Sequence, residues 1–313
     1  MSLSLIRGVR EKLSVANCGI DPERVIMSAI HTHTGPGYTR FINEPTRNEE
    51  GILPEGDANA STFNAFIAMI EKYLAPNQRY VESAEISSRD DVATDREVYD
   101  MLVERISKAI IDAWNSREEG SLTNAFGRAP VGMCRRAVYS DNTAQMWGNT
   151  DTAVFTELEG GNDSGIELLY IFGKSDELTG IVANLACPAQ CVQHRHFVSP
   201  DFRGEVKMLL RRRFGDNIFL LPQCSAAGDQ CPVDIIRYVE PESPINDPNC
   251  ERVNPKRRKA DPSMFDLAGM RLTGRRIANE IIAVFEDGLD TPTSEAPLTH
   301  NIDYRCYRFA ELP

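Results

Sequence analysis

Four of the five histidines in the chain form two His-x-His pairs, His31/His33 and His194/His196. Residues i and i+2 of an extended segment point to the same side, so each pair can present two imidazoles together. Neutral imidazole is a good zinc ligand, with Zn–N distances of about 2.0–2.1 Å. The first pair follows a short apolar run and precedes a Gly-Pro-Gly turn, a typical place for a site in an α/β fold. This pattern predicts metal binding, although His-x-His also occurs in amidohydrolases and several other metal enzymes.

Two further segments contain residues that are suited to a polar site. Residues 222–232 follow a predicted buried strand, and their small side chains allow the sharp turn that a site at a strand end requires. The simpler interpretation of this segment is a plain turn with a buried cysteine. Arg135 and Arg136 stand next to each other among small residues. An arginine fork can hold a carbonyl or carboxylate group, whereas the alternative is a surface ion pair.

Taken together, these segments resemble neutral ceramidases. Residues 28–37, Ser-Ala-Ile-His-Thr-His-Thr-Gly-Pro-Gly, are similar to the Thr-His-Thr-His-Ser-Gly-Pro-Gly segment of that family. Cys134-Arg135 resembles its Asn-Arg, and residues 228–232, Gly-Asp-Gln-Cys-Pro, resemble its Gly-Asp-x-Ser-Pro motif. Residues 184–187 and 198–201 resemble the stretch around its second zinc histidine, and the order of the segments agrees. The resemblance implies a zinc-dependent amidase that cleaves the N-acyl bond of ceramide with a metal-activated water.

The resemblance also implies zinc ligands. His31 matches a zinc ligand of the family, but Pro188 stands where the family has its second zinc histidine. His194 and His196 lie a few residues away and are the local candidates to replace that ligand. The glutamate and tyrosine ligands that ceramidases carry late in the chain have no counterpart that we can place.

Four other residues receive roles from the same resemblance. His33 and Arg135 would polarise the amide carbonyl and stabilise the oxyanion. Asp229 would support the loop or a ligand. Cys231 stands where the family has a serine, and it either takes the role of that serine or binds zinc directly as a thiolate.

The elements that must position these residues follow from hydrophobic periodicity. We expect an α/β fold in which a mixed β-sheet core is flanked by helices on both faces. Residues 1–313 would form a single ceramidase-like catalytic domain that is truncated at both ends. The first expected helix begins at about residue 5 and is ended by Gly19, and the others cover about residues 61–74, 98–114, 202–214 and 266–285. The expected strands are 24–30, 166–172, 180–186 and 217–222, and the long loops are 39–60 and 236–262.

Composition limits the partners. A formal charge of −12 argues against nucleic acid, because phosphate binding needs clustered positive charge. No apolar run approaches the ~20 residues of a membrane span, and the first residues lack a signal-peptide pattern. We therefore expect a small-molecule or lipid amide as substrate and a cytoplasmic location, or a secreted or periplasmic one if the N-terminus is missing. The alternatives are an amidohydrolase-type metal hydrolase and a non-catalytic binding domain that retains the ceramidase fold; the oligomeric state stays open.

Overall fold

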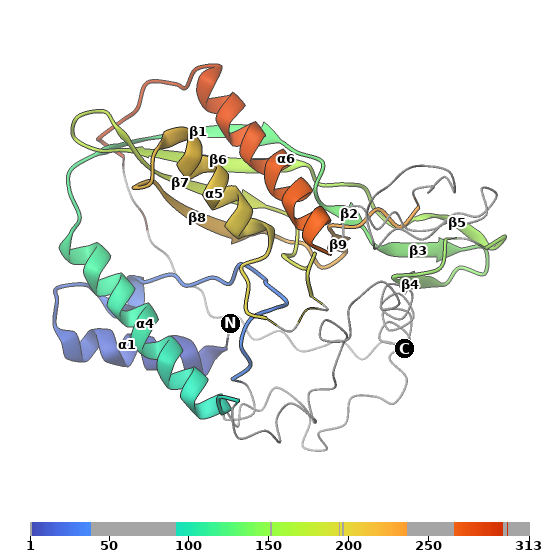
Figure 1. Cartoon of the computed structure of the whole chain (residues 1–313), viewed down its shortest axis with the longest axis horizontal. Coiled ribbons are helices and arrows are strands. Elements are labelled where there is room, and N and C mark those ends of the chain that lie inside the picture. The colour runs from blue at the N-terminus through green and yellow to red at the C-terminus, as the bar shows by residue number, and fades with distance from the viewer. Residues whose placement is uncertain are drawn as a thin grey trace.

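The described part of the chain is built on a four-stranded mixed β-sheet, next to which lie helices, a two-stranded sheet and a three-stranded sheet, as Figure 1 shows. The structure is a computed structural model, and it describes residues 2–38, 92–150, 152–193, 195, 197–236, 266–296 and 299. The expected helix at 61–74, most of both expected long loops, and His194, His196 and His300 lie outside the described residues. No helix in the described part is both long and apolar enough to cross a membrane.

The predicted helices and strands from residue 98 onwards appear in the predicted order, whereas the predicted strand at 24–30 does not form. The helices are α1 (Leu3–Ala16), the 3-10 helix η1 (Pro22–Arg24), α4 (Asp95–Asn115), α5 (Phe202–Phe214) and α6 (Asp266–Glu286). The strands are β1 (Ser121–Arg128), β2 (Met133–Cys134), β3 (Arg136–Tyr139), β4 (Ala144–Met146), β5 (Phe155–Leu158), β6 (Gly165–Phe172), β7 (Leu178–Leu185), β8 (Phe219–Cys224) and β9 (Gln230–Cys231).

The central sheet has the strand order β1-β6-β7-β8. β1 and β6 pair antiparallel, as do β6 and β7, whereas β7 and β8 run parallel. The predicted α/β class with a mixed sheet is thus confirmed. The sheet is not the parallel barrel that an amidohydrolase would need, because two of its three pairings are antiparallel.

Alternate side chains of the central strands face helices α5 and α6. Register pairs such as Leu168 with Ala183 and Tyr170 with Ile181 point to this face and are buried. The hydroxyl of Tyr170 donates to the Ile281 carbonyl of α6 over 2.6 Å, which fixes this helix against β6. Burying such side chains supplies about 25 cal/mol per Å² of apolar surface, so this cluster is the main core.

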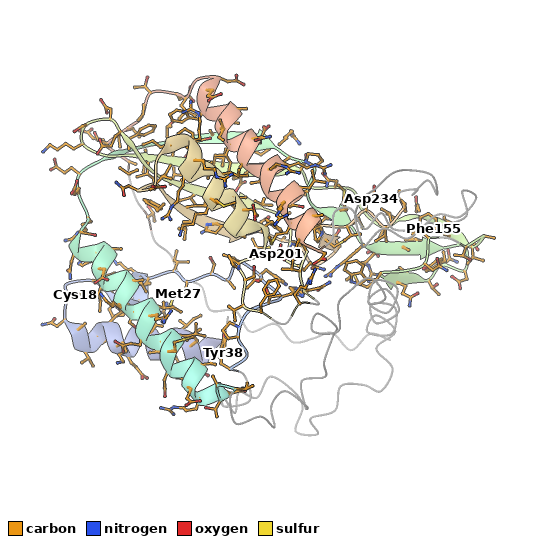
Figure 2. All side chains as sticks on the ribbon, in the orientation of Figure 1. Cys18, Met27, Tyr38, Phe155, Asp201 and Asp234 are labelled. Atoms are coloured by element: carbon orange, nitrogen blue, oxygen red, sulfur yellow. The ribbon has the colours of Figure 1, made fainter. Side chains whose placement is uncertain are left out.

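In the described part of the chain, helices α5 and α6 pack side by side on one face of the central sheet (Figure 1). Helices α1 and α4 pack against each other in a second apolar cluster around Val9 and Leu13. Met27 and Tyr38, labelled in Figure 2, pack against that second cluster. We expected helices on both faces of the sheet. In the described part of the chain only one face is covered, by α5 and α6, while α1 and α4 form a separate pair.

The prediction of a buried strand at residues 24–30 is wrong. Residues 25–31 have no strand structure, and Ile26 is 78% exposed. The apolar residues of this run instead include Val25 and Met27, which pack against the α1–α4 cluster. The segment reaches the rest of the fold through an isolated parallel bridge between Thr32 and Ala189.

Candidate functional site

The imidazoles of His31 and His33 lie side by side. Their ring centroids are 5.2 Å apart and their planes differ by 14°. The i, i+2 spacing predicts neighbouring imidazoles if the segment is a strand. The segment is instead irregular, and His31 adopts a left-handed φ of 57°. Non-glycine residues rarely adopt positive φ, and such strained positions cluster at functional sites.

Backbone contacts hold the histidine segment on both sides. The amide of Ala189 donates to the His31 carbonyl over 3.2 Å, and the amide of His33 donates to the Ala189 carbonyl over 3.1 Å. The hydroxyls of Thr32 and Thr34 donate to the Ser199 carbonyl over 2.7 and 3.0 Å. The two stretches that resemble the second zinc-histidine region thus lie directly against the His-x-His motif.

The Cys-Arg segment and the Gly-Asp-Gln-Cys-Pro segment also meet. Strands β2 and β9 pair antiparallel, with Met133 opposite Cys231. Gly132, just before β2, lies so close to the backbone of Ala186 that a β-carbon at position 132 would collide with the Ala186 carbonyl oxygen. The backbone amide of Arg135 donates to the Asp229 carbonyl over 2.8 Å. The four motif segments that the sequence analysis selected therefore converge on one region.

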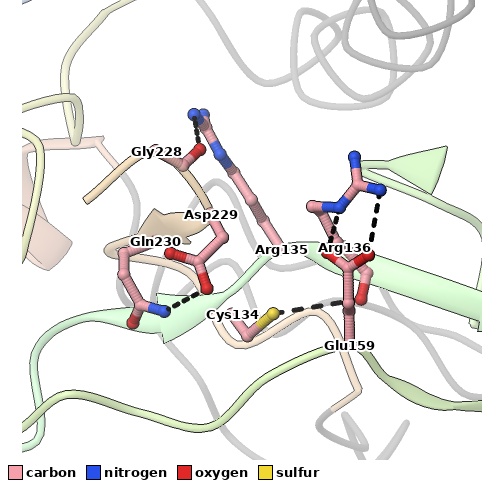
Figure 3. Close-up of polar contacts among 7 residues, drawn as sticks. All are labelled: Cys134, Arg135, Arg136, Glu159, Gly228, Asp229 and Gln230. Atoms are coloured by element: carbon pink, nitrogen blue, oxygen red, sulfur yellow. Dashed lines mark hydrogen bonds and ion pairs between the residues drawn. The ribbon is translucent and has the colours of Figure 1, made fainter. Parts of the chain in front are cut away.

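The two adjacent arginines have different environments, as Figure 3 shows. Arg136 is an exposed partner of Glu159 in a surface ion pair. Arg135 is half-buried, donates from Nη2 to the Gly228 carbonyl over 2.9 Å, and lies 5.6 Å from the centroid of the Trp147 ring. Arg136 therefore forms the surface ion pair that was the alternative for this segment. Arg135 instead lies in the region where the motif segments meet.

Residues 187–193 form a loop that joins the histidines to Arg135. Nη1 of Arg135 lies 3.5 Å from Oε1 of Gln190, whose side chain belongs to this loop. Gln193, three residues further on, hydrogen-bonds through its side chain to His33. One loop thus contacts both the imidazole pair and the guanidinium that sequence reasoning assigned to the same site.

The environment lowers the pKa of both imidazoles, which favours the neutral ring at neutral pH, although both side chains are exposed. Loss of solvation lowers the pKa of His33 to about 4, helped by the positive charges of His31 and Arg135, although the residue still reaches solvent. The same loss of solvation, followed by the charges of Arg135 and Arg203, lowers the pKa of His31. A neutral ring keeps a lone pair free for a metal or a proton.

Asp229 and Cys231 lie beside Arg135 but contact neither histidine in the described structure. Oδ2 of Asp229 accepts a hydrogen bond from Nε2 of Gln230 over 3.0 Å, which fits a role in supporting the loop. The thiol of Cys231 is fully buried and donates to the Val233 carbonyl over 3.0 Å. Burial raises the pKa of this thiol to about 12, so without a bound metal it stays protonated.

Sequence reasoning missed a second arginine near the site. Arg203, on the first turn of α5, is only 3% exposed, and its Nη2 donates to the Cys187 carbonyl over 3.2 Å. It follows Asp201, whose carboxylate accepts from the backbone amides of Val192 and Phe202 (Figure 2). The charge of Arg203 acts on His31. The sequence does not single out Arg203, because α5 contains four arginines and only the packing shows that this one is buried.

The described side chains provide only some of the donors that a zinc site needs. Catalytic zinc sites use three protein ligands, and the described ranges contain no cluster of three or more His, Cys, Asp or Glu side chains that could hold a metal. His31 and His33 supply two neutral imidazoles in the state that binds zinc. The described residues thus fit part of a zinc ligand set, and a third ligand has to come from residues outside them.

The fold and the site define an α/β domain with a polar site at the junction of the histidine segment, the loop 187–193 and the β2–β9 pair. No protein-family model and no curated protein matches the chain.

The solved structures that are similar to the chain include two ceramidases. A crystal structure of neutral ceramidase from Pseudomonas aeruginosa aligns with a TM-score of 0.43 and 15% sequence identity, over 62% of this chain and 27% of that one. A structure of ceramidase complexed with C2 aligns with a TM-score of 0.41 and 14% identity, over 62% of this chain and 26% of that one. The chain therefore spans only a quarter or so of their length, and similarity at this level does not assign it to their family.

Proposed function

We propose that this chain is a hydrolase of the ceramidase type that cleaves a linear N-acyl amide in a zinc-dependent reaction. The observation that carries the proposal is the loop 187–193, which contacts His33 through Gln193 and Arg135 through Gln190. Two neutral imidazoles beside a guanidinium provide a base and an electrophile within one site. This is the set of groups that hydrolysis of an amide requires.

Arg135 is the group that would stabilise the negative charge on the amide oxygen. Its Nη2 is held by Gly228, whereas its buried Nε has no hydrogen-bond partner and can donate to a substrate oxygen. His33, oriented by Gln193, would polarise the same carbonyl or hold a proton at its free ring nitrogen. Asp229 would position Arg135 through the backbone hydrogen bond that joins them.

Zinc is part of this proposal. His31 would hold it, with His194 and then His196 as candidates for the ligand that Pro188 cannot supply. When bound, zinc lowers the pKa of a water molecule towards about 7 and so provides the nucleophile.

The function is tested by incubating the metal-loaded chain with a short fluorescent N-acyl sphingosine and with simpler N-acyl amines. We expect release of free amine that a chelator abolishes and that His31→Ala removes. Arg136→Lys, which changes only the surface pair with Glu159, is the matched control and should retain the activity.

A non-catalytic binding domain is the second candidate. It is favoured by the lack of a three-ligand metal cluster within the described ranges. If metal-loaded protein releases no amine from any N-acyl substrate but still binds one of them, this second function replaces the first.

A further inference from the structure

Two arginines of the site are buried without a carboxylate partner. Within the described ranges, neither Arg135 nor Arg203 forms an ion pair, although nine other pairs between basic and acidic side chains do form. Two acids lie two residues from Arg203 in sequence, Asp201 and Glu205, and neither forms an ion pair with it. The carboxylate of Asp201 is already bonded to two backbone amides. A buried cation is costly unless a negative group compensates it. Here the charges of Asp229 and Asp201 act on the two guanidinium groups without forming an ion pair, so each cation is compensated only in part.

The same region contains an excess of hydrogen-bond donors. Five buried donor atoms of this region, within the described residues, have no hydrogen-bond partner: Nε of Arg135, Nε2 of Gln190, Nε2 of Gln193, and Nε and Nη1 of Arg203. Gln190 is 1% exposed and Arg203 is 3% exposed, so bulk water does not satisfy them. Buried donors are almost always paired in native proteins, and five unpaired ones close together in the fold indicate a ligand that accepts hydrogen bonds.

The loop 187–193 brings these donors together. Its first residue, Cys187, holds Arg203 through the carbonyl, and Gln190 contacts Arg135. Ala189, between them, is bonded to the backbone of His31 and His33. The charges of both guanidinium groups also lower the pKa of His31.

We propose that Gln190, Gln193 and Arg203 form a subsite for a carboxylate beside His31, His33 and Arg135, so that the preferred substrate is an N-acyl amino acid. A carboxylate is an acceptor-only, planar anion that matches guanidinium and amide donors. A ceramide-like amino alcohol would place hydroxyl groups in this subsite. Each hydroxyl carries a hydrogen-bond donor in addition to its acceptor, and that donor would find no acceptor among the unpaired N–H groups. The substrate part of the proposal rests on the proposed hydrolase function, whereas carboxylate binding does not.

Binding is tested with two ligands that differ in one group, N-hexanoylglycine and N-hexanoylethanolamine. Isothermal titration calorimetry on the intact chain should give at least tenfold tighter binding of the glycine conjugate, because charge-assisted hydrogen bonds are roughly twice as strong as neutral ones. Equal affinity for the two ligands, or no binding of either, overturns the proposal.

Variants show whether the assigned residues are responsible. Arg203→Met should remove the preference, while Arg212→Met, an exposed change on the same helix, should keep it. Gln190→Glu keeps the shape of the side chain but replaces a donor with an anion, so it should reverse the preference even if Arg203→Met fails to fold. A preference that survives Gln190→Glu places the carboxylate elsewhere and contradicts the proposal.

Hydrolysis of the same two compounds separates this proposal from the proposed function. If N-hexanoylglycine binds tightly but neither compound is cleaved, the carboxylate subsite stands and the hydrolase function fails. If both compounds are cleaved at the same kcat/KM, the hydrolase function stands and the carboxylate subsite fails.

Discussion

The imidazole of His33 lies against that of His31, with 5.2 Å between ring centroids, and its ring also hydrogen-bonds to Gln193. The two rings are close enough that the charge of one opposes protonation of the other. Arg135 and Arg203 add to this effect at His31. The site therefore keeps both imidazoles neutral, which is the state that any metal-binding or base role needs.

The first prediction concerns pH. The pKa of His33 is about 4 in the folded chain and near 6.5 in an unfolded one. The unfolded chain thus binds more protons between these values, so stability should rise with pH across this window and fall on acidification. NMR titration of the metal-free protein should give a His33 midpoint near 4, and His33→Gln should flatten the pH dependence of unfolding. A midpoint near 6.5 would contradict the described environment.

The second prediction separates the two adjacent arginines. Arg135→Lys should lower kcat by about 10²-fold or more, because a single ammonium cannot replace a fork that bonds Gly228 and still offers Nε to the substrate. Arg136→Lys should change the rate by no more than about twofold, since exposed ion pairs contribute ~0–1 kcal/mol. Steady-state kinetics on N-acyl substrates provide the measurement. Equal losses in both variants would show that Arg135 has no special role.

The third prediction concerns what anchors the site loop. Arg195 and Asp266 form an ion pair in which the side chains are 7% and 3% exposed, and it ties the chain just after the loop to the start of α6. Asp266→Ala should destabilise the fold by about 3–5 kcal/mol, because it leaves a buried guanidinium unpaired. Glu286→Ala breaks an exposed pair with Arg213 at the other end of α6 and should cost less than about 1 kcal/mol. Urea unfolding compares them, and similar costs would refute the anchor.

The fourth prediction tests Cys231. A serine hydroxyl can donate to the Val233 carbonyl as the thiol does, so Cys231→Ser should retain zinc and preserve or raise hydrolysis. Cys231→Ala should lower hydrolysis and cost about 1–3 kcal/mol, because it leaves that carbonyl without its donor. Zinc content and rate are measured on both variants. Loss of zinc from Cys231→Ser would instead identify the thiol as a ligand.

Much of the fold could be predicted because its elements have strong periodic patterns. Helices α4, α5 and α6 and strands β6, β7 and β8 lie within a few residues of the predicted ranges. The run at 24–30 misled the prediction because a short apolar segment is compatible with any packed environment. Here Val25 and Met27 pack against α1 and α4 while Ile26 faces solvent.

The candidate site was predictable only in part. Spacing identified His31 and His33 as neighbours, although the positive φ that brings this about has no sequence signal. Family resemblance identified Arg135, Asp229 and Cys231. Gln190 and Arg203 were not predictable, because their roles depend on burial and on unpaired donors, which arise only when the loop 187–193 folds against α5 and β2.

The most direct test of the account is the zinc content of the chain. Elemental analysis of protein from a zinc-replete preparation should find close to one zinc per chain, and His31→Ala should lose it. Separate His194→Ala and His196→Ala variants then identify the next ligand, with the larger loss expected for His194. Metal-free wild-type protein, or zinc that stays bound in His31→Ala, would contradict the zinc-dependent hydrolase proposed here.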